Sequence, residues 1–507
     1  MEKKTDSLGK RYLFKLASNI ASIPLYLVME AVLPRALGPS AYGHFGFSTA
    51  IFQNFTNFLD LGTSTCLTTA LAKRPGEFGL GAFYLRISAC VFILCMAAAL
   101  AMHLPGAGEA LMPGLPLWLA VPAAFWAYLT WFARVARGAD DALGLTTASE
   151  CVRIGANILA VAVLLSLYAT GLLTLPVLFA QQYLCLGLGA AGFIFVMRRA
   201  FARPRRLALS GEEWKSYARE FAAYCSPLFV LALCSAFALS AERWMLQFFE
   251  GSVEQGYFSL SQKIGAACIL FVTAMTPLLT RELAVAHARR DPAEMARLLD
   301  RYAPMLYALC AWMSCFVLAE SRTILLIFGG EAFADALPSV RVLALYPVHQ
   351  AYGQVAAAIF YAGGKTRALR NISLATLLLG LAVSWLLLAP ARFCGLGLGA
   401  FGLALKMVFI QFLSVNLLLF AARREAPFGY ARNLLHQLLC PPVFLGAAFL
   451  ASGIASFWDG AGDIPRFLAS GAGYALISLL LLLACPAVCG LSRADLRALL
   501  NRLPFKI

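Results

Sequence analysis

The sequence predicts an all-α polytopic membrane protein. Its 507 residues are 61% hydrophobic and only 13% charged, a composition typical of a chain that crosses the bilayer many times. Apolar stretches long enough to cross about 30 Å of hydrocarbon as a helix, which takes roughly 20 residues, recur about fourteen times. Helices are favoured because the stretches lack the alternating pattern of a barrel strand, and because each backbone amide in lipid needs a local partner.

The expected spans follow one another with short connections. They are 12–34, 42–70, 80–102, 115–135, 147–168, 172–197, 222–249, 253–280, 303–327, 334–362, 368–390, 396–421, 433–457 and 466–489. No connection is long enough to fold as a soluble catalytic domain. The 14 cysteines lie mostly within the spans without a CxxC pair, and we interpret them as packing residues rather than metal ligands. We therefore expect the function of the protein, whatever it is, to lie within the membrane.

Lys and Arg residues gather in every second connection. With the N-terminus placed in the cytoplasm, the two ends and the even-numbered connections hold 30 of the 41 Lys and Arg residues, whereas the opposite connections hold Arg35, Arg392 and Arg466. Cytoplasmic loops carry such an excess, so both termini are predicted to be cytoplasmic. The same pattern accounts for the net charge of +15 without a nucleic-acid partner.

A short motif occurs once in each half of the chain. Two glycines, a phenylalanine and a serine of segment 38–48 recur in segment 251–261 at a constant offset of 213 residues. Each copy follows the first helix of a predicted six-helix lobe, so we predict a duplication. The expected parts are 1–210 with helices one to six, 211–432 with helices seven to twelve, and 433–507 with helices thirteen and fourteen and a cytoplasmic tail. In transporters built from parallel repeats the cargo binds between the lobes.

Eight cations lie inside the apolar spans. They are Lys15, Arg86, Arg153, Arg243, Lys263, Arg322, Arg341 and Lys406. A charge at a helix centre costs at least about 2.5–3.5 kcal/mol, so such residues are usually paired or face water. Lys15, Arg86, Arg243 and Arg322 lie near a boundary and can snorkel, whereas Arg153, Lys263 and Lys406 lie nearest to mid-span. The alternative for Arg153 is an ion pair with Glu150, three residues earlier on the same helix face.

Acidic residues inside the spans are fewer. Gln53, Asn57, Asp60 and Ser64 are spaced to share one helix face, which indicates either a cavity lining or interhelical hydrogen bonding. Asp60 and Glu30 are candidate ligands of a coupling cation. An excess of cations suits an anionic cargo such as a diphosphate, which Arg binds in a fork. The predicted substrate-binding residues are Arg153, Lys263, Lys406, Arg86, Arg243 and Arg341.

Several segments resemble Wzx-type polysaccharide flippases of the multidrug/oligosaccharidyl-lipid/polysaccharide (MOP) exporter superfamily, over about the whole chain. The resemblance is carried by Asn19, residues 35–43, Asp60-Leu61-Gly62, residues 242–246 followed by 251–260, residues 328–330, and residues 336–345. One departure is Glu242, where members of the family often carry Asp, and the charge is kept.

This resemblance implies a V-shaped transporter of twelve to fourteen helices, with two six-helix lobes in a MATE-like arrangement. It would lie in the bacterial inner membrane and move an undecaprenyl-diphosphate-linked oligosaccharide by alternating access, for lipopolysaccharide O-antigen or another surface polysaccharide. Coupling to Na⁺ or H⁺ is implied, with no other cofactor, and other polysaccharide assembly proteins are expected partners. As in lipid II flippases, spans 433–457 and 466–489 would form a groove for the lipid tail.

Three alternatives stay open. A multidrug:cation antiporter of the same superfamily predicts acids, not bases, in the cleft. A membrane polysaccharide polymerase or ligase predicts a large external loop with catalytic polar residues. A scaffold subunit of an envelope assembly would have no need for charges inside its spans.

Overall fold

The computed structural model describes residues 8–75, 77–200, 210–226, 229–363, 365–457, 462–491 and 493. Within them the regular elements are α-helices and short 3-10 helices, and ten helices are long and apolar enough to cross a membrane. The prediction of an all-α polytopic protein is confirmed, whereas the count of fourteen spans is not established. The basic residues 201–209 and the predicted tail beyond 493 lie outside the described residues.

The chain divides into two compact units, Met1–Gly256 and Tyr257–Ile507. These bounds differ from the lobe boundaries expected at 210 and 432, so the three-part scheme remains a prediction. Helix α9 contributes to both units.

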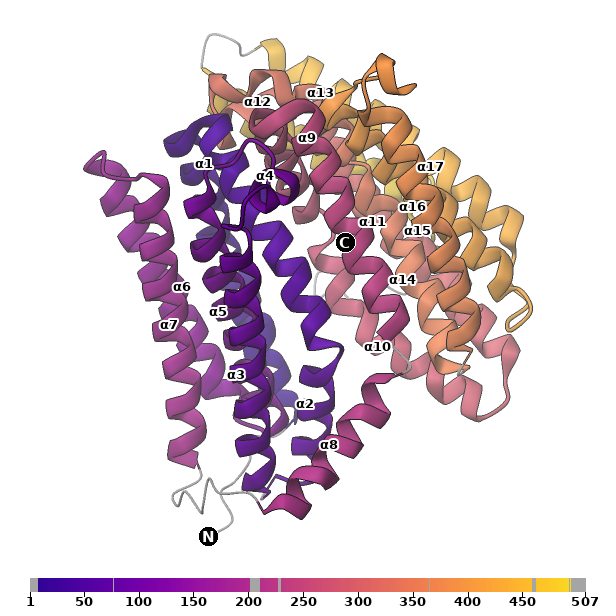
Figure 1. The fold of residues 1–507 in the computed structure, drawn as a ribbon. Helices are drawn as coiled ribbons and strands as arrows, with labels where there is room; N and C mark the ends of the chain where they lie inside the picture. Colours follow the sequence, from indigo (N-terminus) through magenta and orange to yellow (C-terminus); the bar gives the residue numbers. More distant parts are fainter. Residues whose placement is uncertain are drawn as a thin grey trace. The chain divides into compact units, whose positions relative to one another are not determined.

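The first unit is built around α5. Its elements are α1 (Leu8–Asp60), α2 (Thr63–Lys73), α3 (Phe78–Ala101), α4 (Ala107–Leu111), α5 (Ala120–Ala142), α6 (Thr146–Ala169), α7 (Leu175–Ala200), α8 (Gly211–Cys225) and the first part of α9 (Phe229–Ala267). Helix α5 packs against α1, α3 and α7 (Figure 1). Trp131 of α5 joins Phe83 of α3 and Phe221 of α8 in one buried cluster, so apolar burial fixes the short helix α8 on this unit.

The second unit is built around α11. Its elements are the rest of α9, α10 (Leu270–Ala288), α11 (Pro292–Ala319), α12 (Ser321–Phe328), α13 (Leu337–Leu343), α14 (Tyr346–Ala362), α15 (Thr366–Leu388), α16 (Gly399–Ala422), α17 (Tyr430–Ala455) and α18 (Asp463–Ala484). Helix α11 packs against α10, α14 and α17, and α17 packs along α18. Tyr474 of α18 stacks on Trp312 and Phe316 of α11, which attaches the C-terminal helix pair to this unit.

Two of the longest helices are each formed by two helices that meet at a glycine. Gly38 of α1 has φ 72° and Gly251 of α9 has φ 82°, a left-handed conformation that glycine adopts without steric cost. The two breaks are 213 residues apart, as the repeated motif predicts.

Several predicted spans are interrupted where continuous helix was expected, among them 42–70, 303–327, 253–280 and 334–362. The span 42–70 breaks at Leu61 and Gly62, which have φ 47° and 86°, so Ser64 belongs to α2 and does not share a helix face with Gln53, Asn57 and Asp60. The span 253–280 is divided between α9 and α10, and the span 334–362 between α13 and α14. In the last case Pro347 in the first turn of α14 favours a new helix start there.

Candidate functional site

The two copies of the repeated motif contact each other through their backbones. A Cβ atom added to Gly43 would lie 1.7 Å from the carbonyl oxygen of Ser252, and one added to Gly256 would lie 2.2 Å from that of Pro39. At the offset of 213, Gly43 corresponds to Gly256 and Pro39 to Ser252, so the two contacts are the same contact seen from each copy. This reciprocal arrangement supports the predicted duplication. We call residues 38–43 and 251–256 the paired turns.

Arg243 lies beside the paired turns. Its guanidinium donates a hydrogen bond to Gln255 at 3.1 Å, and the Gln255 amide donates back to the Arg243 carbonyl. Glu242 and Tyr42 act on it electrostatically.

Glu30, a candidate ligand of a coupling cation, is 7% exposed. It accepts a hydrogen bond from the Tyr42 hydroxyl at 3.4 Å. Tyr42 thus interacts with two residues that were predicted to have different roles. Arg243 was predicted to bind the cargo, and Glu30 was predicted to bind a coupling cation.

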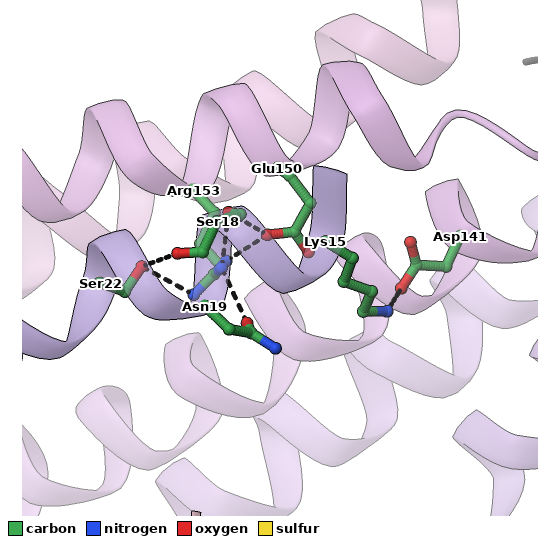
Figure 2. A network of polar contacts seen from close by, with 7 residues as sticks. All are labelled: Lys15, Ser18, Asn19, Ser22, Asp141, Glu150 and Arg153. Atoms are coloured by element: carbon green, nitrogen blue, oxygen red, sulfur yellow. Dashed lines mark hydrogen bonds and ion pairs between the residues drawn. The ribbon is translucent and has the colours of Figure 1, made fainter. Parts of the chain in front are cut away.

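Arg153 lies in a polar network between α6 and α1. Its Nε donates to Glu150 at 2.6 Å, and its terminal nitrogens donate to Ser18 at 2.7 Å, Asn19 at 3.0 Å and Ser22 at 3.1 Å. Figure 2 shows the guanidinium reaching the polar side of α1 that these three residues form. The structure thus contains the ion pair that was the alternative for Arg153, and its role in cargo binding stays a prediction.

The same network continues to α5. The Lys15 ammonium contacts the Asp141 carboxylate at 2.7 Å, and the Ser18 hydroxyl donates to Glu150 at 2.7 Å (Figure 2). Glu150 is 1% exposed, whereas the Lys15 side chain is 44% exposed. The first half of α1 is therefore fixed to α6 by the hydrogen bonds of Ser18 with Glu150 and Arg153, and to α5 by the exposed ion pair of Lys15 with Asp141.

Asp60 caps a helix. Its Oδ1 accepts hydrogen bonds from the Ser64 amide at 3.0 Å and the Thr63 hydroxyl at 2.9 Å, and its Oδ2 accepts one from the Ser64 hydroxyl at 2.7 Å. Thr63 and Ser64 are the first two residues of α2, which begins after the break at Leu61 and Gly62. A carboxylate at a helix start satisfies amides that have no partner within the helix. A role in cation coupling remains a prediction for Asp60.

Arg86 and Arg341 lie at exposed positions. The guanidinium of Arg86, on α3, lies 5.5 Å from the centroid of the Trp214 ring of α8. That of Arg341, on α13, donates from Nε to the Ser321 hydroxyl at 3.1 Å. The structure brings neither of them to another predicted cargo residue through a described contact.

Helix α8 is held near Arg86 by polar contacts outside the spans. Arg74 donates two hydrogen bonds to Glu220 at 2.6 and 2.8 Å, and this contact raises the pKa of Arg74. At the start of α8, Ser210 and Glu213 form a capping box. The hydrogen bonds from Ser210 lower the pKa of the Glu213 carboxyl.

Lys263 and Lys406 both belong to the second unit. Lys406, on α16, is 7% exposed, and Lys263, on α9, is half-buried. A Cβ atom at Gly380 of α15 would lie 3.0 Å from Cε and 3.3 Å from Nζ of Lys406. The absence of a side chain at Gly380 therefore leaves the space that the end of the Lys406 side chain occupies.

An apolar pocket of about 520 Å³ lies in the second unit between α14, α16 and α17. Its lining is almost entirely apolar: Val342, Leu345, Val348, His349, Leu405, Val408, Phe409, Phe412, Gln437, Leu438, Pro441 and Pro442. None of these residues comes from α18. The pocket is thus separate from the groove expected between spans 433–457 and 466–489, which remains a prediction.

The family of the chain follows from its sequence. A family model for polysaccharide biosynthesis proteins matches residues 8–279, more than half of the chain. The chain belongs to this family. No curated protein shows a significant sequence match to it.

Solved structures show the fold of this family member. A lipid II flippase, MurJ, in an inward closed conformation aligns with a TM-score of 0.66 and 13% identity, covering 93% of this chain and 98% of that chain. An inward-facing multidrug resistance MATE transporter of the MOP superfamily aligns with a TM-score of 0.59 and 14% identity, covering 82% and 97%. The predicted resemblance is confirmed for the polysaccharide biosynthesis family, and the fold is like that of these two solved structures.

Some residues of these sites were not predicted from the sequence. Ser18 and Ser22, which bind Arg153, are four residues apart in an apolar span, and this spacing was the available signal. Among the described residues no cluster of three or more His, Cys, Asp or Glu side chains could hold a metal ion.

Proposed function

We propose that this polysaccharide biosynthesis protein moves an undecaprenyl-diphosphate-linked oligosaccharide across the bacterial inner membrane by alternating access. It would not be an enzyme, and the oligosaccharide would serve a surface polysaccharide such as O-antigen. The observation that carries the proposal is the pair of lysines, Lys263 and Lys406, in the second unit of a MOP-fold protein. A cationic side chain inside a membrane-spanning segment costs free energy, so its presence there indicates a function.

Six residues are proposed to bind the diphosphate. Arg153, Arg243, Arg86 and Arg341 make the contacts described above. Lys263 and Lys406 belong to one unit, and both are predicted to lie close to mid-span, where a cation costs most. We assign the first contacts with the diphosphate to these two lysines.

The hydrocarbon part of the cargo needs an apolar site. The pocket between α14, α16 and α17 has an apolar lining and lies in the same unit as Lys263 and Lys406. We assign the prenyl chain to this pocket, because hydrocarbon is favoured wherever apolar side chains exclude polar groups.

The driving force is proposed to be entry of Na⁺ or H⁺. Glu30 and Asp60 are the proposed coupling residues; the carboxylate of Asp60 also accepts three hydrogen bonds from α2, and that of Glu30 accepts one from Tyr42. The lipid bilayer and other polysaccharide assembly proteins are the proposed partners.

Removing both lysines is expected to abolish surface polysaccharide. The test variant is Lys263→Gln with Lys406→Gln. The control is Arg281→Gln with Arg297→Gln, which removes the same charge from side chains that are 75% and 73% exposed. Polysaccharide at the cell surface and folded protein in the membrane are measured together. Wild-type export by the double-lysine variant would contradict the proposal.

A second variant tests position rather than charge. Gly380→Ala keeps every charge but places a methyl group against the end of Lys406. Export is expected to fall in this variant, and full export would show that the position of the ammonium is unimportant.

A further inference from the structure

A hydrogen-bonded chain crosses the second unit from α11 to the segment that follows α18. The Asn433 amide donates to Asp300 at 3.0 Å, and the Tyr352 hydroxyl donates to the Asn433 oxygen at 3.1 Å. The same hydroxyl contacts Nδ1 of His436 at 3.4 Å, and Nε2 of His436 contacts the Val488 carbonyl at 3.0 Å.

The protons of this chain can be counted from its ends. The Asp300 carboxylate pairs with Arg432 at 2.6 Å and accepts only, so the Asn433 nitrogen must face it and the Asn433 oxygen must face Tyr352. Tyr352 has one hydroxyl proton, and the Asn433 oxygen takes it. At the other end a carbonyl also accepts only, so Nε2 of His436 must carry a proton.

When His436 is neutral, the contact between its Nδ1 and the Tyr352 hydroxyl has no proton left to share. Nδ1 and the Tyr352 oxygen then face each other as two acceptors, or the hydroxyl turns to Nδ1 and leaves Asn433 without a donor. A proton on Nδ1 completes both contacts, because the imidazolium donates to Tyr352 and to Val488 at once.

From this geometry we infer that His436 is a proton-binding site that makes the packing of α17 depend on pH. Proton uptake adds a hydrogen bond between α17 and α14 while α17 keeps its bonds to α11 and to residue 488. The titratable groups that contact the imidazole are Tyr307 of α11 and Tyr352 of α14. One contact further away are Asp300 of α11, which pairs with Arg432 of α17, His349 of α14, which contacts the Tyr307 ring, and Cys489, which follows Val488.

The sign of the effect follows from the bonds. The complete chain belongs to the protonated form, so the hydrogen bond between His436 and Tyr352 is made at low pH and is lost as the pH rises through the midpoint of His436 protonation. This inference does not depend on the cargo, so a failed transport experiment and a failed titration are distinguishable.

The test is a titration of ¹⁵N-labelled histidine by NMR, with the full chain in lipid nanodiscs. His436→Gln identifies the signal. We expect Nδ1 to gain a proton between about pH 8 and pH 5, with the neutral form protonated on Nε2.

Two tyrosines provide a matched pair of variants. Tyr352 and Tyr307 are both fully buried, and both rings contact the His436 ring, at 6.4 and 5.6 Å between centroids. The Tyr307 hydroxyl donates instead to the Gln437 carbonyl. Tyr352→Phe is expected to lower the midpoint by about one pH unit, a factor of ten in proton affinity, and Tyr307→Phe to leave it unchanged.

Two results would overturn the inference. One is that Nδ1 of His436 in the wild-type protein gains no proton in this pH range. This result does not depend on whether any variant folds. The other is an equal shift of the midpoint in the two tyrosine variants.

Discussion

Gly43→Ala and Gly256→Ala are each expected to destabilise the structure described here and to stop export. A methyl group at Gly43 would lie 1.7 Å from a backbone oxygen, and one at Gly256 would lie 2.2 Å from another. Because a backbone carbonyl cannot rotate away as a side chain can, the paired turns must separate. Overpacking of this kind costs about 1–3 kcal/mol, which lowers the population of the contacting state by roughly 5–150-fold.

The reciprocal geometry makes this prediction specific. After one methyl group has separated the turns, the second should cost little more, so the double variant is expected to be less destabilised than the sum of the single variants. The matched control is Gly155→Ala, because a Cβ atom at Gly155 of α6 meets no atom within 4 Å. The free energy of unfolding and export are measured for all four variants. Additive effects, or single variants as stable as the control, would show that the paired turns are not in close contact.

Glu150→Gln is expected to be the most destabilising single change in the network of the first unit. It leaves the Arg153 guanidinium, whose side chain is 15% exposed, without its carboxylate in an apolar environment. Breaking a buried pair from one side costs about 3–5 kcal/mol. Lys15→Met breaks the exposed pair with Asp141, which is worth about 0–1 kcal/mol. The free energy of unfolding of each variant is the measurement.

A double variant separates the structural role of Arg153 from a role in cargo binding. Glu150→Gln with Arg153→Gln removes both charges and is expected to recover most of the stability. If Arg153 only holds α1 against α6, this variant exports polysaccharide, and if Arg153 also binds the diphosphate, it folds but does not export. Wild-type stability of Glu150→Gln alone would show that the pair is not buried in the membrane.

The features that the sequence predicted correctly depend on local pattern. Long apolar runs are sufficient to predict helices in lipid, because no other structure satisfies an isolated backbone there. The pair of Glu150 and Arg153 follows from helix geometry, since residues three apart share a face. The repeat at Gly38 and Gly251 also lies in the sequence itself, and the two glycines share one backbone conformation.

The features that were missed depend on how helices pack. Nothing local places Ser18 beside Arg153 or Gly380 beside Lys406, because each pair lies on different helices. The break after Asp60 did have a local signal, since Asp60 is followed by a glycine and by Thr63 and Ser64. An acid before a glycine and hydroxyl residues is typical of a helix start, but the apolar residues around it favoured one continuous span.

Transfer of the cargo in reconstituted vesicles tests the central claim most directly. Vesicles containing the purified protein and an undecaprenyl-diphosphate-linked oligosaccharide are followed with an impermeant lectin that detects sugar in the outer leaflet. We predict that sugar appears there faster than in vesicles without the protein, that a Na⁺ or H⁺ gradient accelerates it, and that Lys263→Gln with Lys406→Gln abolishes it. Folded wild-type protein that moves no sugar but exchanges a cationic drug for Na⁺ or H⁺ would contradict the account.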